Sequence, residues 1–301
     1  MAECIITYLR FPSTTILSVI FCNIEYQKLL HFRMKKKKIY RWASILIMIY
    51  CIIGIGIYYG QDKVMFHPVP LKPDYNYNFH MPYKEVNIPY ATGVNMNVIQ
   101  FTTTDSVPRG VVLYFHGNKQ NIGHYATYAP SFTKQGYEVW MIDYPGYGKS
   151  TGSFTEQHLY DWALTFYKLA RARFKPDSII LYGKSMGTGI ATQLASIRDC
   201  KRLILECPYY SFPSIAGSYF PIYPVERMIR LKIPTWQYMQ QVTAPVTIFH
   251  GTDDGVIRFS NAEKLQPFLK PIDQFITLEG GSHNNLSEYP MYQQKLDSLL
   301  K

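Results

Sequence analysis

A serine that could act as a nucleophile lies in the sequence Gly-Lys-Ser-Met-Gly at 183–187. The apolar run 178–182 before it is typical of a strand, and the small-residue run 188–195 after it is typical of a helix. A Gly-x-Ser-x-Gly pattern between a strand and a helix predicts a sharp, strained turn that lifts the serine hydroxyl above a sheet. The two glycines would let strand and helix approach where a Cβ atom would clash. The pattern therefore predicts nucleophilic chemistry at Ser185.

Ser185 needs a base and an acid, because a serine hydroxyl is a weak nucleophile at neutral pH. The glycine-rich loop after the last predicted strand ends in His283, which we expect to be the general base. The loop after the preceding strand carries two adjacent carboxylates, of which Asp254 is the expected orienting acid and Asp253 the less favoured substitute. The chain order serine, aspartate, histidine is the order found in one large class of serine hydrolases.

Acyl transfer also needs donors for the oxyanion of the tetrahedral intermediate. The sequence His-Gly-Asn at 116–118 follows another predicted strand. We expect the backbone N–H groups of Asn118 and of Met186, the residue after the nucleophile, to form the oxyanion hole. Gly117 would allow that backbone to come close.

Other residues at strand ends could be mistaken for triad members. His116 and His250 each precede a glycine, and we expect them to tie loops together by hydrogen bonds. Glu206 is an alternative acid, ranked well below Asp254 because strand-end carboxylates often only accept loop N–H groups. Ser185 could also be a structural serine in a hydrolase fold that has lost its activity.

The elements that must position these residues follow from hydrophobic periodicity. Eight predicted strands alternate, from the third onward, with predicted helices, which indicates a mostly parallel sheet covered by helices on both faces. The first two strands have no helix between them and should form an antiparallel edge hairpin. The expected strands are 85–88, 96–101, 111–115, 138–142, 178–181, 202–205, 246–249 and 274–278, and the expected helices are 122–135, 155–173, 186–198, 259–268 and 286–300. Ligands bind such sheets at the carboxyl ends of the strands.

A membrane anchor is expected before this domain. The stretch from Trp42 to Gln61 holds twenty residues without a charge, enough as a helix to cross about 30 Å of hydrocarbon. A lysine cluster at 35–38 precedes it, and the positive-inside rule places such a cluster in the cytoplasm. We expect a single-pass, uncleaved transmembrane helix at 40–60, with a cytoplasmic N-terminus and an extracytoplasmic, periplasmic or lumenal domain over 61–301. A buried core helix and a cleaved signal peptide are the alternatives.

The chain before the helix is expected to be a cytoplasmic basic or disordered terminus over 1–39. Within it, residues 1–33 hold only a short apolar patch, and Met34 is followed by four lysines, as at the start of a signal anchor. We therefore expect residues 1–33 to be disordered or to result from a mis-called start.

The net charge of +10 is concentrated near the N-terminus. Residues 1–41 hold eight Lys or Arg against two acidic residues, a net +6, and the remaining 260 hold 23 against 19, a net +4. A nucleic-acid-binding domain would carry its positive excess on the folded part. We expect no nucleic-acid partner.

Over about residues 60–301, the sequence resembles the membrane-anchored α/β-hydrolases of the BEM-like, serine-aminopeptidase-related (hydrolase-4-like) group, which includes animal α/β-hydrolase-domain esterases and depalmitoylating enzymes. The resemblance implies an α/β-hydrolase fold with a small lid, and it assigns nucleophile, acid and base to Ser185, Asp254 and His283. Lys119 and Gln120 stand where the family has small residues, and Arg258 replaces a proline. The motifs that carry the resemblance lie at 61–68, 116–118, 143–150, 183–187, 206–208, 250–254 and 281–283.

The expected lid, about 208–244, favours a substrate class. It is rich in aromatic residues and holds one acid, Glu226, against three basic residues. An aminopeptidase must neutralise a substrate ammonium, for which this lid offers little. An aromatic lid beside a bilayer suits acyl esters or thioesters better, including those of lipids, although the aromatics could equally be lid packing. We expect a serine hydrolase of carboxylic esters or thioesters, with a serine aminopeptidase-like peptidase and a non-catalytic binding protein as alternatives. No metal-ligand spacing, phosphate loop or dinucleotide fingerprint is present, so no cofactor or metal is implied.

Overall fold

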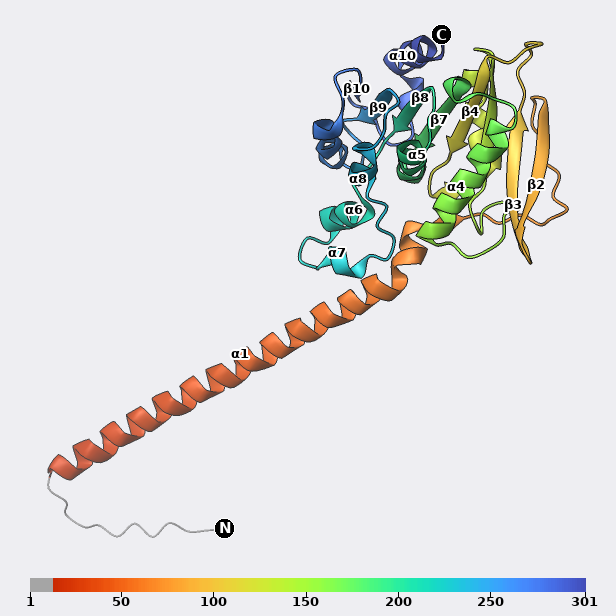
Figure 1. Cartoon of the computed structure of the whole chain (residues 1–301). Helices are drawn as coiled ribbons and strands as arrows, with labels where there is room; N and C mark the ends of the chain where they lie inside the picture. Colours follow the sequence, from red (N-terminus) through yellow and green to blue (C-terminus); the bar gives the residue numbers. More distant parts are fainter. Residues whose placement is uncertain (1–12) are drawn as a thin grey trace. The chain divides into compact units, whose positions relative to one another are not determined.

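The computed structural model describes the backbone of residues 13–301 and the side chains of residues 24–301 (Figure 1). Contacts within the chain divide it between Tyr59 and Gly60 into two compact units. The first unit is almost entirely one helix, and the second holds every strand of the described residues.

Helix α1 runs from Ser13 to Met65, and its last turns, residues 60–65, belong to the second unit. Its segment Ile24–Met65 is long and apolar enough to cross a membrane. Large apolar side chains such as Leu46 and Ile47 are 64% exposed, as the lipid-facing residues of an anchor would be. The structure continues α1 back to Ser13, and the expectation that residues 1–33 are disordered or result from a mis-called start stays a prediction. Residues 1–12 lie outside the described part.

The second unit contains one eight-stranded sheet, as predicted, in the order β10-β9-β8-β7-β4-β6-β3-β2. Neighbouring strands are parallel except at the β2–β3 and β3–β6 pairs, so the expected antiparallel edge hairpin is confirmed. Figure 1 shows the strands side by side from β10 to β2. They are β2 (Tyr83–Ala91), β3 (Val94–Phe101), β4 (Gly110–Phe115), β6 (Tyr137–Ile142), β7 (Ile179–Lys184), β8 (Arg202–Glu206), β9 (Val246–Gly251) and β10 (Gln274–Leu278).

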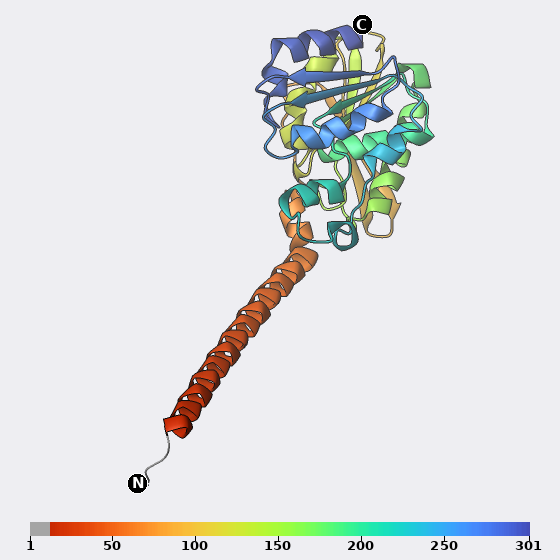
Figure 2. The same ribbon diagram turned by 90° about the vertical axis from the view of Figure 1, so that its left-hand side faces the viewer.

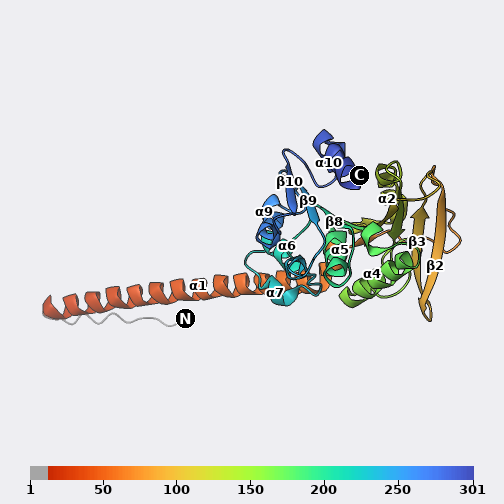
Figure 3. The same cartoon turned by 45° about the horizontal axis from the view of Figure 1, so that its top comes forward.

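Helices cover both faces of the sheet (Figures 2 and 3). One face carries α4 (Glu156–Arg171) and α5 (Met186–Ile197), and the other carries α10 (Pro290–Leu300) with α2 (Ile122–Tyr125), the 3₁₀ turn η1 (Ala126–Tyr128) and α3 (Pro130–Thr133). The helix expected over 122–135 is thus three short pieces, and Pro130 begins the last of them because proline fits the first turn of a helix. The remaining pieces are η2 (Pro176–Ser178), α9 (Phe259–Ala262), η3 (Glu263–Phe268) and η4 (Leu286–Glu288).

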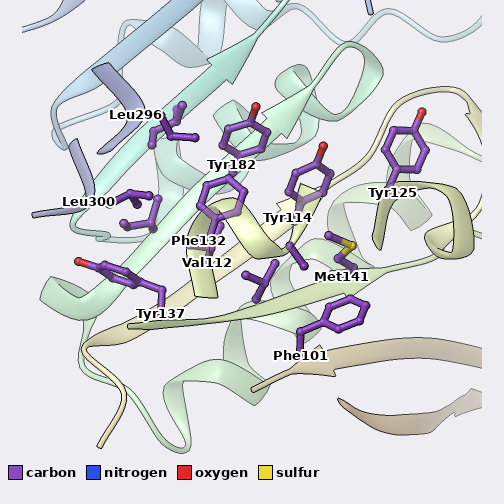
Figure 4. Packing of buried hydrophobic residues seen from close by; sticks show 14 of the residues in the cluster. Phe101, Val112, Tyr114, Tyr125, Phe132, Tyr137, Met141, Tyr182, Leu296 and Leu300 are labelled. Atoms are coloured by element: carbon purple, nitrogen blue, oxygen red, sulfur yellow. The ribbon is translucent and has the colours of Figure 1, made fainter. Parts of the chain in front are cut away.

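The core on the α10 face combines aromatic and aliphatic side chains, with nine aromatic residues among 24 in the described chain (Figure 4). Tyr114 of β4 and Tyr182 of β7 stack with ring centroids 4.8 Å apart, and Phe132 of α3 meets Tyr182 edge-on at 5.3 Å. Burying one such ring contributes about 1.5 to 3 kcal/mol. The next residue of β4, Phe115, points to the opposite face and packs against Phe166 of α4. Successive side chains of β4 therefore lie on opposite faces of the sheet.

Two smaller features complete the unit. Between β8 and β9, the helices α6 (Phe212–Tyr219), α7 (Val225–Met228) and α8 (Thr235–Met239) lie within the expected lid. A two-stranded parallel sheet pairs β1 (His67–Pro68) with β5 (Lys119–Gln120). It joins the chain just after α1 to the loop that follows β4.

Candidate active site

Ser185 occupies a strained turn between β7 and α5, as the sequence predicts. Its φ of 52° and ψ of −120° are unusual for a residue with a Cβ atom. A Cβ atom at Gly187 would lie 2.0 Å from the carbonyl oxygen of Phe115, and one at Gly183 would lie 2.5 Å from that of Gly187. Only glycine fits at these two positions, so the spacing of the motif follows from the close approach of strand and helix.

The structure brings the three predicted triad residues together from three loops. His283 Nε2 lies 2.9 Å from Ser185 Oγ, and His283 Nδ1 lies 2.7 Å from Asp254 Oδ2. All three residues are at most 9% exposed. An imidazole that bridges a hydroxyl and a carboxylate in this way can remove the hydroxyl proton. Asp253, the less favoured substitute, is exposed and hydrogen-bonds its neighbour Thr252.

Asp254 is held as a carboxylate. Burial raises the pKa of its carboxyl, but the hydrogen bond and charge of His283 and the N–H of Ile257 outweigh burial, so the pKa is lowered. Asp254 Oδ1 accepts from the backbone N–H groups of Val256 and Ile257, both at 2.8 Å. With Oδ1 fixed by the loop, Oδ2 is left for the N–H of His283.

Glu206, the alternative acid, is used elsewhere. Its carboxylate forms an ion pair with Lys184 and accepts hydrogen bonds from the hydroxyls of Tyr182 and Tyr292. None of these partners is a triad residue, and Glu206 makes no hydrogen bond to His283 in the described chain. The sequence analysis gave no role to Lys184, Tyr182 or Tyr292. A lysine stands inside the serine motif, but nothing in the sequence shows that it is buried beside Glu206.

The two predicted oxyanion donors flank the serine. Met186 is the first residue of α5, and a Cβ atom at Gly117 would lie 3.6 Å from the Cβ of Ser185, so the 116–118 loop passes beside the nucleophile. Within the described part of the chain, no hydrogen bond occupies the backbone N–H of Asn118 or of Met186. Both donors are therefore available to a ligand at Ser185.

The histidines expected to tie loops together do so. His116 Nδ1 lies 2.7 Å from the carbonyl oxygen of Gly117, and its Nε2 lies 3.3 Å from Asp143 Oδ1. His250 donates from Nε2 to the carbonyl of Ile257 at 2.8 Å. Burial lowers the pKa of His250 and outweighs the nearby carboxylate of Asp254, which keeps this ring neutral.

Cys207, His250 and Asp254 form a group whose potential metal-ligating atoms lie within 4.8 Å of one another. Both oxygens of Asp254 are already engaged by His283 and by backbone N–H groups, and the Cys207 thiol points to the carbonyl of His283 at 3.7 Å. The carboxylate of Asp254 and the thiol of Cys207 are thus already used in contacts among the loops that carry the triad. These residues do not fit a metal centre.

Four of the eight aromatic residues of the lid pack against one another in pairs. The rings of Tyr210 and Trp236 stack at 5.5 Å, and Tyr209 packs against Phe212 at 4.9 Å while donating to the carbonyl oxygen of Met186. Tyr219 is 48% exposed, and its hydroxyl donates to loop carbonyls beside Asp254. Packing within the lid therefore accounts for half of its aromatic residues, and the contact from Tyr209 joins the lid to the first residue of α5.

The chain is similar to known proteins in sequence and in fold. A family profile described as serine aminopeptidase, S33 (Hydrolase_4) matches residues 106–223. Alpha/beta hydrolase domain-containing protein 17C of Xenopus tropicalis is 31% identical over 201 residues. The chain resembles the α/β-hydrolases of the hydrolase-4 group. The match supports the expectation of a serine hydrolase. The aligned part covers 64% of this chain and 62% of the Xenopus protein, so it spans about three fifths of that relative.

Solved structures agree on the fold. The Pyrococcus furiosus esterase Pf2001 superposes on this chain with a TM-score of 0.62 at 16% identity, covering 78% of this chain and 98% of the esterase. A soluble variant of the monoglyceride lipase from Saccharomyces cerevisiae gives 0.57 at 16% identity, covering 77% and 98%. The expected α/β-hydrolase fold is thereby confirmed.

Proposed function

We propose that the protein is a membrane-tethered serine hydrolase that cleaves carboxylic ester or thioester bonds through Ser185, His283 and Asp254. The observation that carries the proposal is the bridging position of His283, 2.9 Å from Ser185 Oγ and 2.7 Å from Asp254 Oδ2. The family match supports the same reaction class.

In the proposed first half-reaction, Asp254 accepts the N–H of His283 Nδ1, which leaves Nε2 without a proton and able to accept one. As Ser185 Oγ bonds to the acyl carbon, its proton passes to Nε2 and the carbonyl electrons move onto oxygen. The N–H groups of Asn118 and Met186 stabilise that oxyanion, each by about 2.7 to 4 kcal/mol. The intermediate then collapses, and the leaving alcohol or thiol takes the proton from His283.

In the second half-reaction, water attacks the acyl carbon of the acyl-enzyme and gives a proton to His283 Nε2. Collapse of this second intermediate breaks the bond to Ser185 Oγ, which recovers the proton, and the carboxylic acid leaves. Each half-reaction uses the same base and the same oxyanion donors, so no additional residue or cofactor is required.

An ester or thioester substrate is favoured by the charge of the lid. Its single acid, Glu226, lies among Arg227, Arg230 and Lys232, so the lid lacks the acidic cluster that would hold a substrate ammonium. The similar esterase and monoglyceride lipase are named for ester substrates. The second candidate is a peptidase, which the description of the matched family as a serine aminopeptidase favours.

Membrane tethering is proposed through residues 40–60 of α1, with the basic residues 33–41 in the cytoplasm and the hydrolase unit on the opposite side. Protease added to the extracytoplasmic side of sealed vesicles should digest the hydrolase unit and leave a membrane-protected fragment that contains α1. Digestion only from the cytoplasmic side would contradict this orientation.

A fluorophosphonate probe tests the chemistry, because it reacts with activated serines. We expect the full-length protein to be labelled, the Ser185→Ala and His283→Ala variants to lose labelling, and Ser178→Ala, at a half-buried serine at the end of η2, to retain it. A folded wild-type protein that is not labelled would rule the enzyme out in favour of a binding protein. Turnover of acyl ester and thioester panels against aminoacyl amides separates the esterase from the peptidase.

A further inference from the structure

The segment 61–70, here called the strap, comprises the last residues of α1 and the chain through β1, and it is bonded to the loop that carries Asn118. The N–H of His67 donates to the carbonyl of Asn118 at 3.0 Å, and the side-chain amide of Asn118 donates to the carbonyl of Met65. The N–H of Val69 donates to the carbonyl of Gln120 at 3.3 Å. The strap therefore holds the Asn118 loop through both backbone and side chain.

These bonds fix the peptide units on both sides of Asn118. The carbonyl of Gly117 lies 2.7 Å from His116 Nδ1, and the carbonyl of Asn118 accepts from His67 N–H and, at 2.8 Å, from the Tyr147 hydroxyl. In a trans peptide the N–H points away from the carbonyl of the same unit. The N–H of Asn118 shares its peptide unit with the Gly117 carbonyl, which His116 holds. The strap holds Asn118 from its other side, through its carbonyl and its side-chain amide.

The other end of the strap contacts the lid. Gln61, only 5% exposed, donates to the carbonyl of Met228 at 3.2 Å and accepts from the N–H of Arg230 at 2.7 Å. Phe66 packs between Phe154 and Phe212, with ring centroids 4.6 and 5.9 Å away. The amide N–H and the amide oxygen of the buried Gln61 side chain are both bonded to the backbone of the lid. These bonds fix the strap to the lid at this point.

We propose that the strap is a positioning element of the catalytic site, which aims the Asn118 N–H at the oxyanion through the bond from His67 and the bond to Met65. This inference rests on the proposed serine hydrolase function. Preorganised donors matter because a displacement of about 1 Å can lower the rate about 100-fold.

The test removes the two hydrogen bonds between the strap and Asn118, one in each variant of the full-length protein. His67→Pro removes the N–H that binds the Asn118 carbonyl, and Asn118→Ala removes the side-chain amide that binds Met65 while keeping its own backbone N–H. Lys72→Pro is the matched control, because Lys72 is exposed, lies beyond the strap and donates no backbone hydrogen bond in the described chain. The readouts are kcat and KM with an ester substrate, the Kd of a tetrahedral boronate inhibitor and the thermal midpoint.

We expect His67→Pro and Asn118→Ala each to lower kcat about 10-fold or more and to leave KM within about twofold. Boronate binding should weaken by the same factor as kcat, since an oxyanion donor is worth about 100-fold or more. The control should match the wild type. If His67→Pro does not fold, Asn118→Ala decides the question. Unchanged kcat in a folded strap variant would overturn the inference, whereas absent wild-type turnover would overturn the proposed function instead.

Discussion

Lys184 and Glu206 form an ion pair inside the protein, directly before the serine elbow. Their side chains are 4% and 0% exposed, and the two residues stand opposite each other at the ends of β7 and β8. Burial alone would lower the pKa of Lys184 and raise that of Glu206, but their mutual attraction outweighs burial and shifts both pKa values the other way. Since the N–H of Ser185 also donates to the carbonyl of Glu206 at 2.8 Å, the pair anchors the backbone from which the nucleophile projects.

Breaking this pair from one side should destabilise the fold. Glu206→Gln or Lys184→Met alone leaves a buried charge without a partner, which costs about 3 to 5 kcal/mol. In the Lys184→Met/Glu206→Gln double variant no charge remains, and the glutamine still offers an acceptor to the hydroxyls of Tyr182 and Tyr292. We expect the double variant to lose at least about 1 kcal/mol less than the sum of the two single losses in urea unfolding. If the losses in unfolding free energy of the two single variants summed to that of the double variant, the two charges would not interact.

The two candidate acids can be separated by activity. Asp254→Asn removes the negative charge that orients His283, and comparable changes lower kcat about 10,000-fold while leaving the fold intact. Glu206→Gln should stay within about 10-fold of the wild type when turnover is expressed per folded molecule at low temperature. The measurements are steady-state ester hydrolysis and the circular dichroism spectrum of each variant. If Asp254→Asn kept full activity and Glu206→Gln abolished it, the assigned acid would be wrong.

Much of this site was predictable because the loops at the carboxyl ends of parallel strands meet at one edge. That rule, with turn glycines, was enough to select Ser185, Asp254 and His283 as neighbours although up to 98 residues separate them. The Lys184–Glu206 pair was not predictable, because it requires β7 to lie beside β8 with those two residues in register. The β1–β5 pair was missed because two-residue strands leave no periodic signal.

The close contacts at the elbow predict a steric effect at Gly187. Alanine there would place a Cβ atom 2.0 Å from the backbone oxygen of Phe115, which cannot move without shifting β4. We expect Gly187→Ala to cost about 3 kcal/mol or more, or to prevent folding. Gly217→Ala in α6 is the matched control, because its Cβ atom would lie 3.5 Å from Val225, and it should be neutral or stabilising by up to about 1 kcal/mol. Thermal midpoints of the two variants check this, and an undiminished midpoint for Gly187→Ala would contradict the close packing.

The buried His250 predicts how stability depends on pH. Because burial lowers its pKa in the folded state, the unfolded chain takes up a proton near pH 6.5 while the folded ring stays neutral. The unfolded state then binds more protons, so the free energy of unfolding should fall as the pH drops below about 6.5, by at most about 1.4 kcal/mol per pH unit for this group. Urea unfolding between pH 5 and pH 8 should show a shallower fall in His250→Gln than in the wild type. The variant should keep a residual slope from His124, whose pKa burial also lowers. Equal slopes in the two proteins would mean that His250 does not take up its proton on unfolding.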